Sequence, residues 1–113
     1  MVDFAVDDVV FHALANSTRR LVLEHLSRGP ATVSELAAPF AMRLPSFVAH
    51  LAVLEESRLV TSSKHGRVRT YALAPEQLTV VEDWLAARRR SWERRLDRFD
   101  AYVTHLKATD TES

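Results

Sequence analysis

The segment from Thr32 to Tyr71 limits the fold of this chain more than any other feature. It has the pattern of a short helix, a tight turn, a second helix and two β-prone runs joined by a basic turn. Thr32 and Glu35 have the spacing of a capping box, which predicts that a helix begins at the next residue, Val33. Pro45 suits the first position of the second helix, where its missing N–H costs nothing.

The second helix of this pair, expected over residues 45–57, contains no Lys or Arg. Helical spacing predicts that its buried stripe consists of Phe47, Val48, Leu51 and Leu54. The opposite face then carries Ser46, Ala49, His50 and Val53.

A hairpin is expected over residues 59–73. The runs 59–63 and 68–73 are β-prone, and Gly66 between them permits the positive φ that a tight turn requires. The connection and the start of the second run are basic, since they carry Lys64, His65, Arg67 and Arg69. A helix-turn-helix over residues 32–57 with a basic hairpin after it is typical of a winged helix-turn-helix, which places one helix in the major groove of DNA. The face of the second helix opposite its buried stripe would then be turned towards DNA.

Helices are also predicted at both ends of the chain. One is expected over residues 4–15, with Phe4 and Phe11 among its apolar positions, and a long one over residues 76–107. From Trp92 onward the apolar positions of the long helix repeat at intervals of four and three residues, a heptad-like stripe that needs a partner helix. The apolar positions of this helix are Leu85, Trp92, Leu96, Phe99, Val103 and Leu106. The polar residues 108–113 are expected to fray.

These elements predict an α+β fold, mostly α, with a two-stranded wing. A length of 113 residues with 47% apolar content suits one small domain, so residues 1–113 are expected to form a single domain. The two terminal helices are expected to build a two-fold dimer interface, through Phe4, Phe11 and the apolar positions of the long helix.

The net charge of the chain is zero, but the charges are unevenly distributed. Residues 1–57 carry four Arg against seven acidic residues, whereas residues 58–107 carry eleven basic residues against six acidic ones. Because phosphate binding depends on a local basic patch and not on net charge, a nucleic-acid partner is compatible with this composition.

Several other classes of protein are disfavoured. The chain has no Cys, which rules out disulfides, zinc thiolates and cysteine nucleophiles. It has no Gly-rich phosphate loop and no constellation of catalytic side chains, so no enzymatic activity, cofactor or resident metal is expected. No apolar run approaches the roughly 18 residues of a membrane span, and the acidic N-terminus lacks the features of a signal peptide, so a soluble cytoplasmic protein is expected.

Three segments carry a family resemblance. They are FHALANSTRRLVLEHLSRGPATVSELAAPFAMRLPSFVAHLAVLEESRLV, GRVRTYAL and WLAARRRSWERRLDRF. With them the chain resembles the arsenic-repressor (ArsR) superfamily of dimeric winged-helix transcriptional regulators. The last segment is similar to a metal-independent branch whose final helix carries a W…W-E-x-R-L-D pattern. The resemblance implies a homodimeric repressor that binds a palindromic operator, and the metal-independent relatives act on their own promoters.

The chain departs from the family pattern at three places. Arg43 stands where the family has Ser after the Met of the turn, and Arg58 replaces the Gly before the first wing strand. Ala49 and Ala52 occupy positions beside the recognition-helix His that are commonly basic. Charge is therefore missing from the centre of the recognition helix and is added at its edges.

These departures shape the expected DNA contacts. Base reading is expected to be limited to Ser46, His50 and methyl contacts from Ala49 or Ala52. Affinity is expected to come mainly from phosphate contacts. The candidates for these contacts are Thr32, Ser34, Arg43, Lys64, His65, Arg67 and Arg69.

Two basic runs are expected to pair within the chain instead. Arg19 and Arg20 are expected to pair with Glu24 or with the acidic first helix. The run 88–90, three consecutive Arg, is expected to pair with acidic neighbours on its own helix.

Three alternatives stay open at this point. Asp8 and His12 are spaced to share a helix face, which would suit a metal-responsive repressor of the same fold. The aromatic residues of the long helix could line a small-molecule pocket. Finally, the apolar recognition helix could bind a protein partner in a module that has lost DNA binding.

Overall fold

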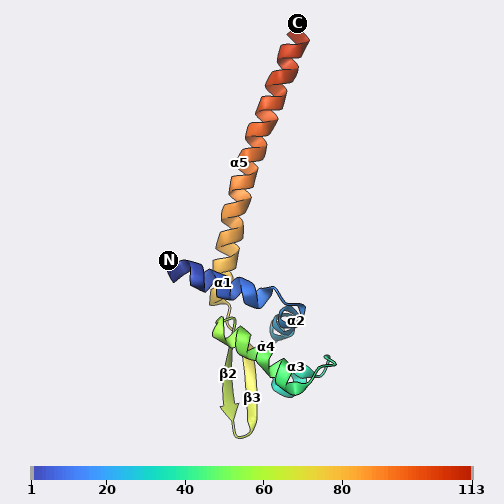
Figure 1. Ribbon diagram of the computed structural model, residues 1–113, viewed down its shortest axis with the longest axis vertical. Helices are drawn as coiled ribbons and strands as arrows, with labels where there is room; N and C mark the ends of the chain where they lie inside the picture. The colour runs from blue at the N-terminus through green and yellow to red at the C-terminus, as the bar shows by residue number, and fades with distance from the viewer. Residues whose placement is uncertain (1, 113) are drawn as a thin grey trace. The chain divides into compact units, whose positions relative to one another are not determined.

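The computed structural model describes the backbone of residues 2–112 and the side chains of residues 8–109 (Figure 1). It divides into two units, residues 1–81 and residues 82–113, and each is described by itself. In chain order the elements are α1 (Val2–Leu14), α2 (Ser17–Leu26), β1 (Ala31–Thr32), α3 (Val33–Ala37), α4 (Leu44–Glu56), β2 (Val60–His65), β3 (Val68–Leu73) and α5 (Glu76–Glu112). The mostly helical fold with a hairpin after the helix-turn-helix agrees with the sequence expectation.

The hairpin of β2 and β3 belongs to a three-stranded antiparallel sheet with the order β1-β3-β2, in which β3 is the central strand. Its connection is a two-residue turn, Gly66-Arg67, between the paired residues His65 and Val68. Gly66 has a φ of 64° and Arg67 is not left-handed, which is the sign pattern of a type II′ turn with Gly at its first central position. Lys64 and His65 therefore extend β2, and the prediction that they belong to the turn is wrong.

Strand β1 was not predicted. Its two residues pair with Tyr71 and Thr70 of β3, and two residues are too few to produce a recognisable alternation. The strand ends where the capping box of α3 begins, so Thr32 belongs to both elements.

The core of the first unit lies between the helices and the base of the hairpin. Phe47, Leu51 and Leu54 of α4 are fully buried, as the helical spacing predicts. They pack with residues from every neighbouring element: Val10, Ala13, Val22, Leu26, Ala31, Leu36, Leu59, Val60 and Tyr71. The first turns of α5 add Leu78 and Val81 to this core.

Arg58, which stands where the family pattern has Gly, lies at the C-terminal end of α4. The N–H groups of Arg58 and Leu59 donate to the carbonyls of Glu55 and Leu54, which is the hydrogen-bond pattern of a Schellman motif. Arg58 takes a left-handed φ of 61° at the position where Gly is usual. For a residue with a Cβ this conformation costs about 1–2 kcal/mol.

Helix α5 is longer than expected. It continues to Glu112, five residues beyond the expected end at residue 107. No Gly or Pro occurs between Glu76 and Glu112 to end the helix. None of the described helices is long and apolar enough to cross a membrane.

The heptad-like stripe of α5 is exposed to solvent in the single chain. Trp92 is 63% exposed, Phe99 61% and Leu96 53%, and Leu85 and Leu106 are also exposed. Val103 is half-buried. Beside the stripe, Arg89 forms an exposed ion pair with Glu93 at 3.7 Å, and the guanidinium of Arg88 lies 5.3 Å from the centre of the Trp84 ring.

Candidate nucleic-acid interface

The outward face of α4 is apolar over most of its length. Leu44 is 56% exposed and Val48 42% exposed, and Ser46, Ala49 and Ala52 are exposed as well. The prediction that Val48 is buried is wrong. Phe47, Leu51 and Leu54 already fill the buried stripe at positions i, i+4 and i+7, and Val48 lies about 100° further round the helix axis.

The first turn of α4 is open at its N-terminus. Arg43 is the N-cap residue, it is exposed, and its side chain makes no capping hydrogen bond. The helix begins at Leu44, one residue earlier than predicted, so Pro45 is its second residue. The backbone N–H groups of Leu44 and Ser46 and the Arg43 guanidinium are therefore available to an anion, whereas Pro45 has no N–H and the N–H of Phe47 donates to the carbonyl of Arg43.

Arg19 connects three helices from a buried position. It is only 7% exposed, and its Nε donates to the carbonyl of Ala13 at 2.8 Å while Nη2 donates to the carbonyl of His12 at 2.9 Å. These carbonyls end α1. The third nitrogen, Nη1, lies 3.1 Å from Nδ1 of His50 on α4. Arg20 likewise donates to the carbonyl of Leu14. The expected pairing of Arg19 and Arg20 with carboxylates is therefore replaced by pairing with the carbonyl end of a helix.

The contact with Arg19 defines the protonation of His50. A guanidinium can only donate, so Nδ1 of His50 must accept, and the ring is neutral with its proton on Nε2. Burial, together with the positive charge of Arg19, lowers the pKa of His50 below its usual value. His50 is half-buried on the flank of α4, so only its Nε2 side remains for a contact with DNA.

Replacing Arg19 by Met is expected to lower the free energy of unfolding by about 3 kcal/mol, because charge-assisted hydrogen bonds to the end of α1 and to His50 are lost together. Chemical denaturation measures the change. Arg19→Lys keeps the charge but cannot reach three acceptors in one plane. Its free energy of unfolding should therefore lie between those of Arg19→Met and the unaltered protein. A decrease in the free energy of unfolding below about 1 kcal/mol for Arg19→Met would show that the guanidinium contacts with α1 and His50 contribute little to stability.

The protonation of His50 also predicts a pH dependence of stability. The unfolded chain takes up a proton on His50 near a pH of about 6.5, whereas the folded chain takes it up only at lower pH. The free energy of unfolding should therefore decrease as the pH falls from about 7 through this window. His50→Asn keeps an acceptor for Arg19 and should remove this part of the slope of the free energy of unfolding against pH. The control His65→Gln should leave the contribution of His50 in place. Identical slopes in the unaltered protein and both variants would contradict the assignment of this contribution to His50.

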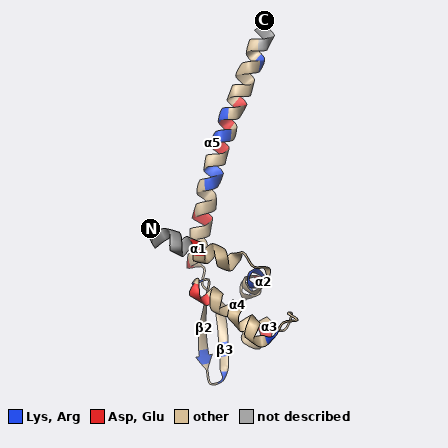
Figure 2. Ribbon diagram, viewed as in Figure 1, with Lys and Arg blue, Asp and Glu red and all other residues tan. Residues whose placement is uncertain are grey.

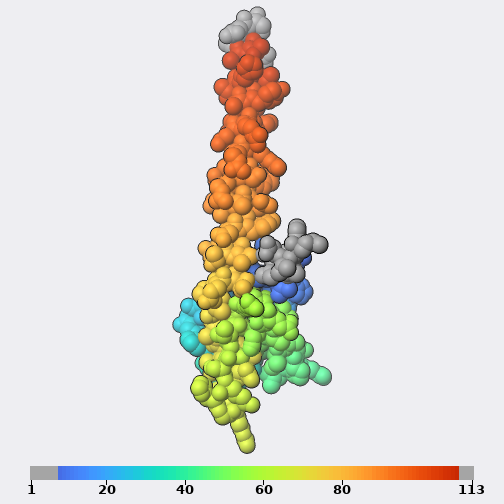
Figure 3. Space-filling view, turned by 90° about the vertical axis from the view of Figure 1, so that its left-hand side faces the viewer, coloured from blue at the N-terminus to red at the C-terminus, as the bar shows by residue number. Residues whose placement is uncertain are grey.

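The wing places like charges opposite each other. Lys64 of β2 pairs in register with Arg69 of β3, and both side chains are exposed on the same face of the hairpin. Such a pair of cations is unfavourable by itself, and a bound anion would relieve the repulsion. Figure 2 shows basic residues near the hairpin tip. Figure 3 shows that this tip projects from the rest of the first unit. Arg67 lies in the turn and is exposed.

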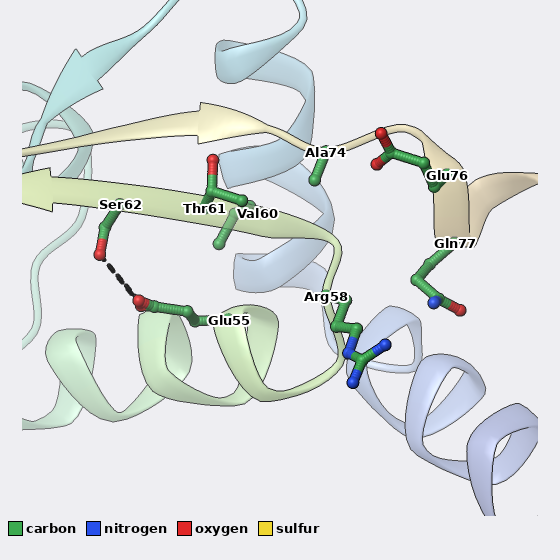
Figure 4. A pocket seen from close by; sticks show the side chains of 8 residues that line it. All are labelled: Glu55, Arg58, Val60, Thr61, Ser62, Ala74, Glu76 and Gln77. Atoms are coloured by element: carbon green, nitrogen blue, oxygen red, sulfur yellow. Dashed lines mark hydrogen bonds between the residues drawn. The ribbon is translucent and has the colours of Figure 1, made fainter.

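The base of the wing is tied to α4. The hydroxyl of Ser62 donates to the Glu55 carboxylate at 2.7 Å, and Nη1 of Arg69 donates to the Ser62 hydroxyl oxygen at 2.8 Å. Figure 4 shows Ser62 and Glu55 at one side of an open hollow of about 510 Å³ beside the end of α4. The wing is thus fixed to the recognition helix at its base, while its tip is free.

Thr32 and Ser34, the two candidate phosphate contacts at the start of α3, differ in whether their hydroxyl groups are available. The Thr32 hydroxyl accepts from the N–H of Glu35 and lies 2.9 Å from the Glu35 carboxylate, so capping occupies it. The hydrogen bond from the Thr32 N–H to this carboxylate lowers the pKa of Glu35. Ser34 is exposed and remains available.

Phe4 and Phe11 were expected at a dimer interface. The side chain of Phe4 lies outside the described residues, and that of Phe11 is half-buried. Asp8 and His12 are both exposed on α1, but within the described part of the chain no group of three or more His, Asp or Glu side chains is placed to hold a metal ion.

Comparison with known proteins agrees with this geometry. A family described as a helix-turn-helix domain matches residues 14–63. The HTH-type transcriptional regulator Rv2034 of Mycobacterium tuberculosis is 36% identical over 96 residues, which cover 85% of this chain and 87% of that protein. A solved ArsR family transcriptional regulator is 54% identical with a TM-score of 0.76, over 79% of this chain and 92% of that one. The chain belongs to the ArsR family of transcriptional regulators.

Two further relatives lie within the same class. The transcriptional repressor SdpR of Bacillus subtilis is 31% identical over 66% of this chain and 79% of its own length. An ArsR-like transcriptional regulator from Rhodococcus sp. RHA1 is 29% identical with a TM-score of 0.72, over 88% of this chain and 93% of that one. ArsR family members are DNA-binding regulators and not enzymes, and the lack of Cys fits the metal-independent branch of the family.

Sequence reasoning missed three residues of the interface region. Arg19 is 31 residues from His50, so their contact leaves no local signal. Leu44 was assigned to the turn and Val48 to the core. The exposure of Val48 could have been found by counting helix positions from Phe47, since the stripe of Phe47, Leu51 and Leu54 was already complete. Leu44 lies three residues before Phe47 on the same side of the helix, so helical spacing gives no signal of its exposure.

Proposed function

We propose that this ArsR-family protein is a transcriptional repressor that binds a palindromic operator as a homodimer, and that the operator lies at its own promoter. The observation that carries the proposal is the combination on one unit of an α4 with an exposed apolar face and no Lys or Arg, and cations at its N-terminus and on the neighbouring hairpin. Repression is proposed because the relative SdpR is named a transcriptional repressor.

The division of contacts follows from where the charges lie. Arg43 at the start of α4 and the wing cations Lys64, Arg67 and Arg69 would bind phosphates on either side of the groove. Ser34 would add a hydroxyl contact at the start of α3, and His65 would add its ring. The hydroxyl and the N–H of Thr32 are both occupied by the capping box, so Thr32 is not proposed as a phosphate contact. Ser46, Ala49 and the Nε2 side of His50 would face the bases.

The homodimer is proposed from the exposed stripe of α5. Large apolar side chains in a heptad-like repeat are not left in water over several turns without a partner. A second copy of the same helix offers a matching stripe, and two-fold symmetry is the commonest arrangement of soluble oligomers. Phe4 and Phe11 of α1 are proposed to contribute to the same interface.

Two-fold symmetry makes a prediction about DNA. Recognition helices from the two subunits would enter successive major grooves, about 34–36 Å apart, so the two half-sites should be inverted and one helical turn apart. Selection of bound sequences from a random duplex pool, followed by a gel shift with the upstream DNA of the gene, tests this directly. The proposal expects an inverted repeat and two chains per duplex. Enrichment of no sequence would contradict it, and would favour a module that binds a protein through α4.

A further inference from the structure

We propose that the exposed apolar face of α4 selects operators by contacting the 5-methyl groups of thymines. The face consists of Leu44, Val48, Ala49 and Ala52, and the proposal rests on the proposed DNA-binding function. It assigns a specificity role to Leu44 and Val48 and names the chemical group that they read.

Thymine is the base whose major-groove edge suits such a face. Its C5-methyl group is the apolar group that the four bases present there, whereas cytosine and adenine present amino groups and guanine presents acceptors. Leu44 and Val48 can bury a methyl group but cannot satisfy a donor or an acceptor. A polar base edge against them would lose its water without a partner, so the face both favours thymine and disfavours the other bases.

The surrounding charges favour DNA as the occupant of this face. Arg43 stands at the N-terminal end of α4, and Lys64 and Arg67 project from the hairpin that is fixed to α4 through Glu55 and Ser62. Figure 2 shows the acidic residues at the opposite, C-terminal end of the helix, where Glu56 is exposed. A phosphate backbone is therefore attracted to the N-terminal half of α4, which is the half that carries Leu44 and Val48.

The spacing of the two side chains limits the operator. Leu44 and Val48 are four residues apart, which is about 6 Å along the helix axis. Base pairs rise about 3.4 Å, so the two side chains can cover methyl groups one or two base steps apart. Each half-site is therefore expected to contain at least two thymines within three consecutive positions.

Deoxyuridine substitution tests the proposal, because it removes only the methyl group. In the operator obtained by selection, the half-site thymines are replaced by deoxyuridine and affinity is measured by fluorescence anisotropy. One contacted methyl should be worth about fourfold in Kd, so the loss of one in each half-site should weaken binding about 16-fold. Thymines outside the half-sites serve as the DNA control.

A protein variant connects the effect to α4. Val48→Ala should weaken binding to the thymine operator and should reduce the penalty for deoxyuridine, since the removed partner can no longer contact the methyl. Leu21→Ala removes an apolar side chain of similar exposure from α2, where Leu21 is 50% exposed, and should leave both affinities unchanged.

The outcomes separate the two proposals. Equal affinity for thymine and deoxyuridine operators overturns the methyl contact and leaves the repressor proposal standing. A deoxyuridine penalty that is the same in Val48→Ala as in the unaltered protein also overturns it, because the methyl is then read by another part of the chain. Failure to bind any selected DNA overturns the proposed function itself, and the thymine reading with it.

Discussion

Leu96→Glu is expected to separate the dimer and to weaken operator binding by at least about 100-fold. Leu96 is 53% exposed in the single chain and lies in the middle of the heptad-like stripe of α5. A Glu there would place a charge in the apolar seam, beside its symmetry mate. A monomer can bind only one half-site, so it loses much of the affinity that distinguishes the operator from unrelated DNA. Specific binding exceeds non-specific binding by about 1,000-fold or more in affinity.

The matched control is Ala101→Glu. Ala101 is exposed on α5, five residues further on and off the stripe, so this variant adds the same charge to the same helix. It should remain a dimer and keep its affinity. Sedimentation measures the oligomeric state and anisotropy the affinity. If Leu96→Glu stays dimeric, α5 is not the principal dimer interface; if it becomes monomeric and binds the operator as before, two-fold recognition is wrong.

Arg67→Ala is expected to reduce affinity for every DNA sequence and to flatten its salt dependence. Each phosphate contact contributes about −0.9 to the slope of log K against log salt concentration. Because a dimer presents two wings, the loss of Arg67 should make the slope less steep by about 1.8. Discrimination between operator and unrelated DNA should hardly change, since the turn residue reads no base.

Two controls accompany the wing variant. Arg67→Lys keeps the charge and should keep most of the slope. Arg28→Ala removes an exposed Arg just after the end of α2, which is not among the proposed DNA contacts, and should leave the slope as it is. An unchanged slope in Arg67→Ala would show that the wing tip does not reach the phosphate backbone, and the cations of Lys64 and Arg69 would then have to account for the salt dependence.

The parts of the fold with strong local signals could be predicted from the sequence. Thr32 and Glu35 form the predicted capping box, and Gly66 provides the positive φ of the hairpin turn. The buried stripe of α4 follows from the spacing of Phe47, Leu51 and Leu54. These signals depend on neighbours three or four residues away, and tertiary structure does not override them.

The parts that were not predicted depend on contacts between distant segments or on small differences in register. The Arg19–His50 contact joins residues far apart in the chain, and no pattern in either helix indicates it. Strand β1 exists because β3 lies beside it. Val48 was placed in the core because it is apolar, although the face on which it lies is turned outward. An apolar residue in a recognition helix is therefore a poor indicator of burial.

The salt dependence of operator binding tests the central claim most directly. The claim is that a homodimer inserts an α4 without Lys or Arg into the major groove while Arg43 and the wing supply the affinity. With four such cations in each subunit, a titration of the selected operator by fluorescence anisotropy should give a slope of log K against log salt concentration between about −4 and −7. A slope near zero, or equal affinity for the operator and a scrambled duplex, would contradict it.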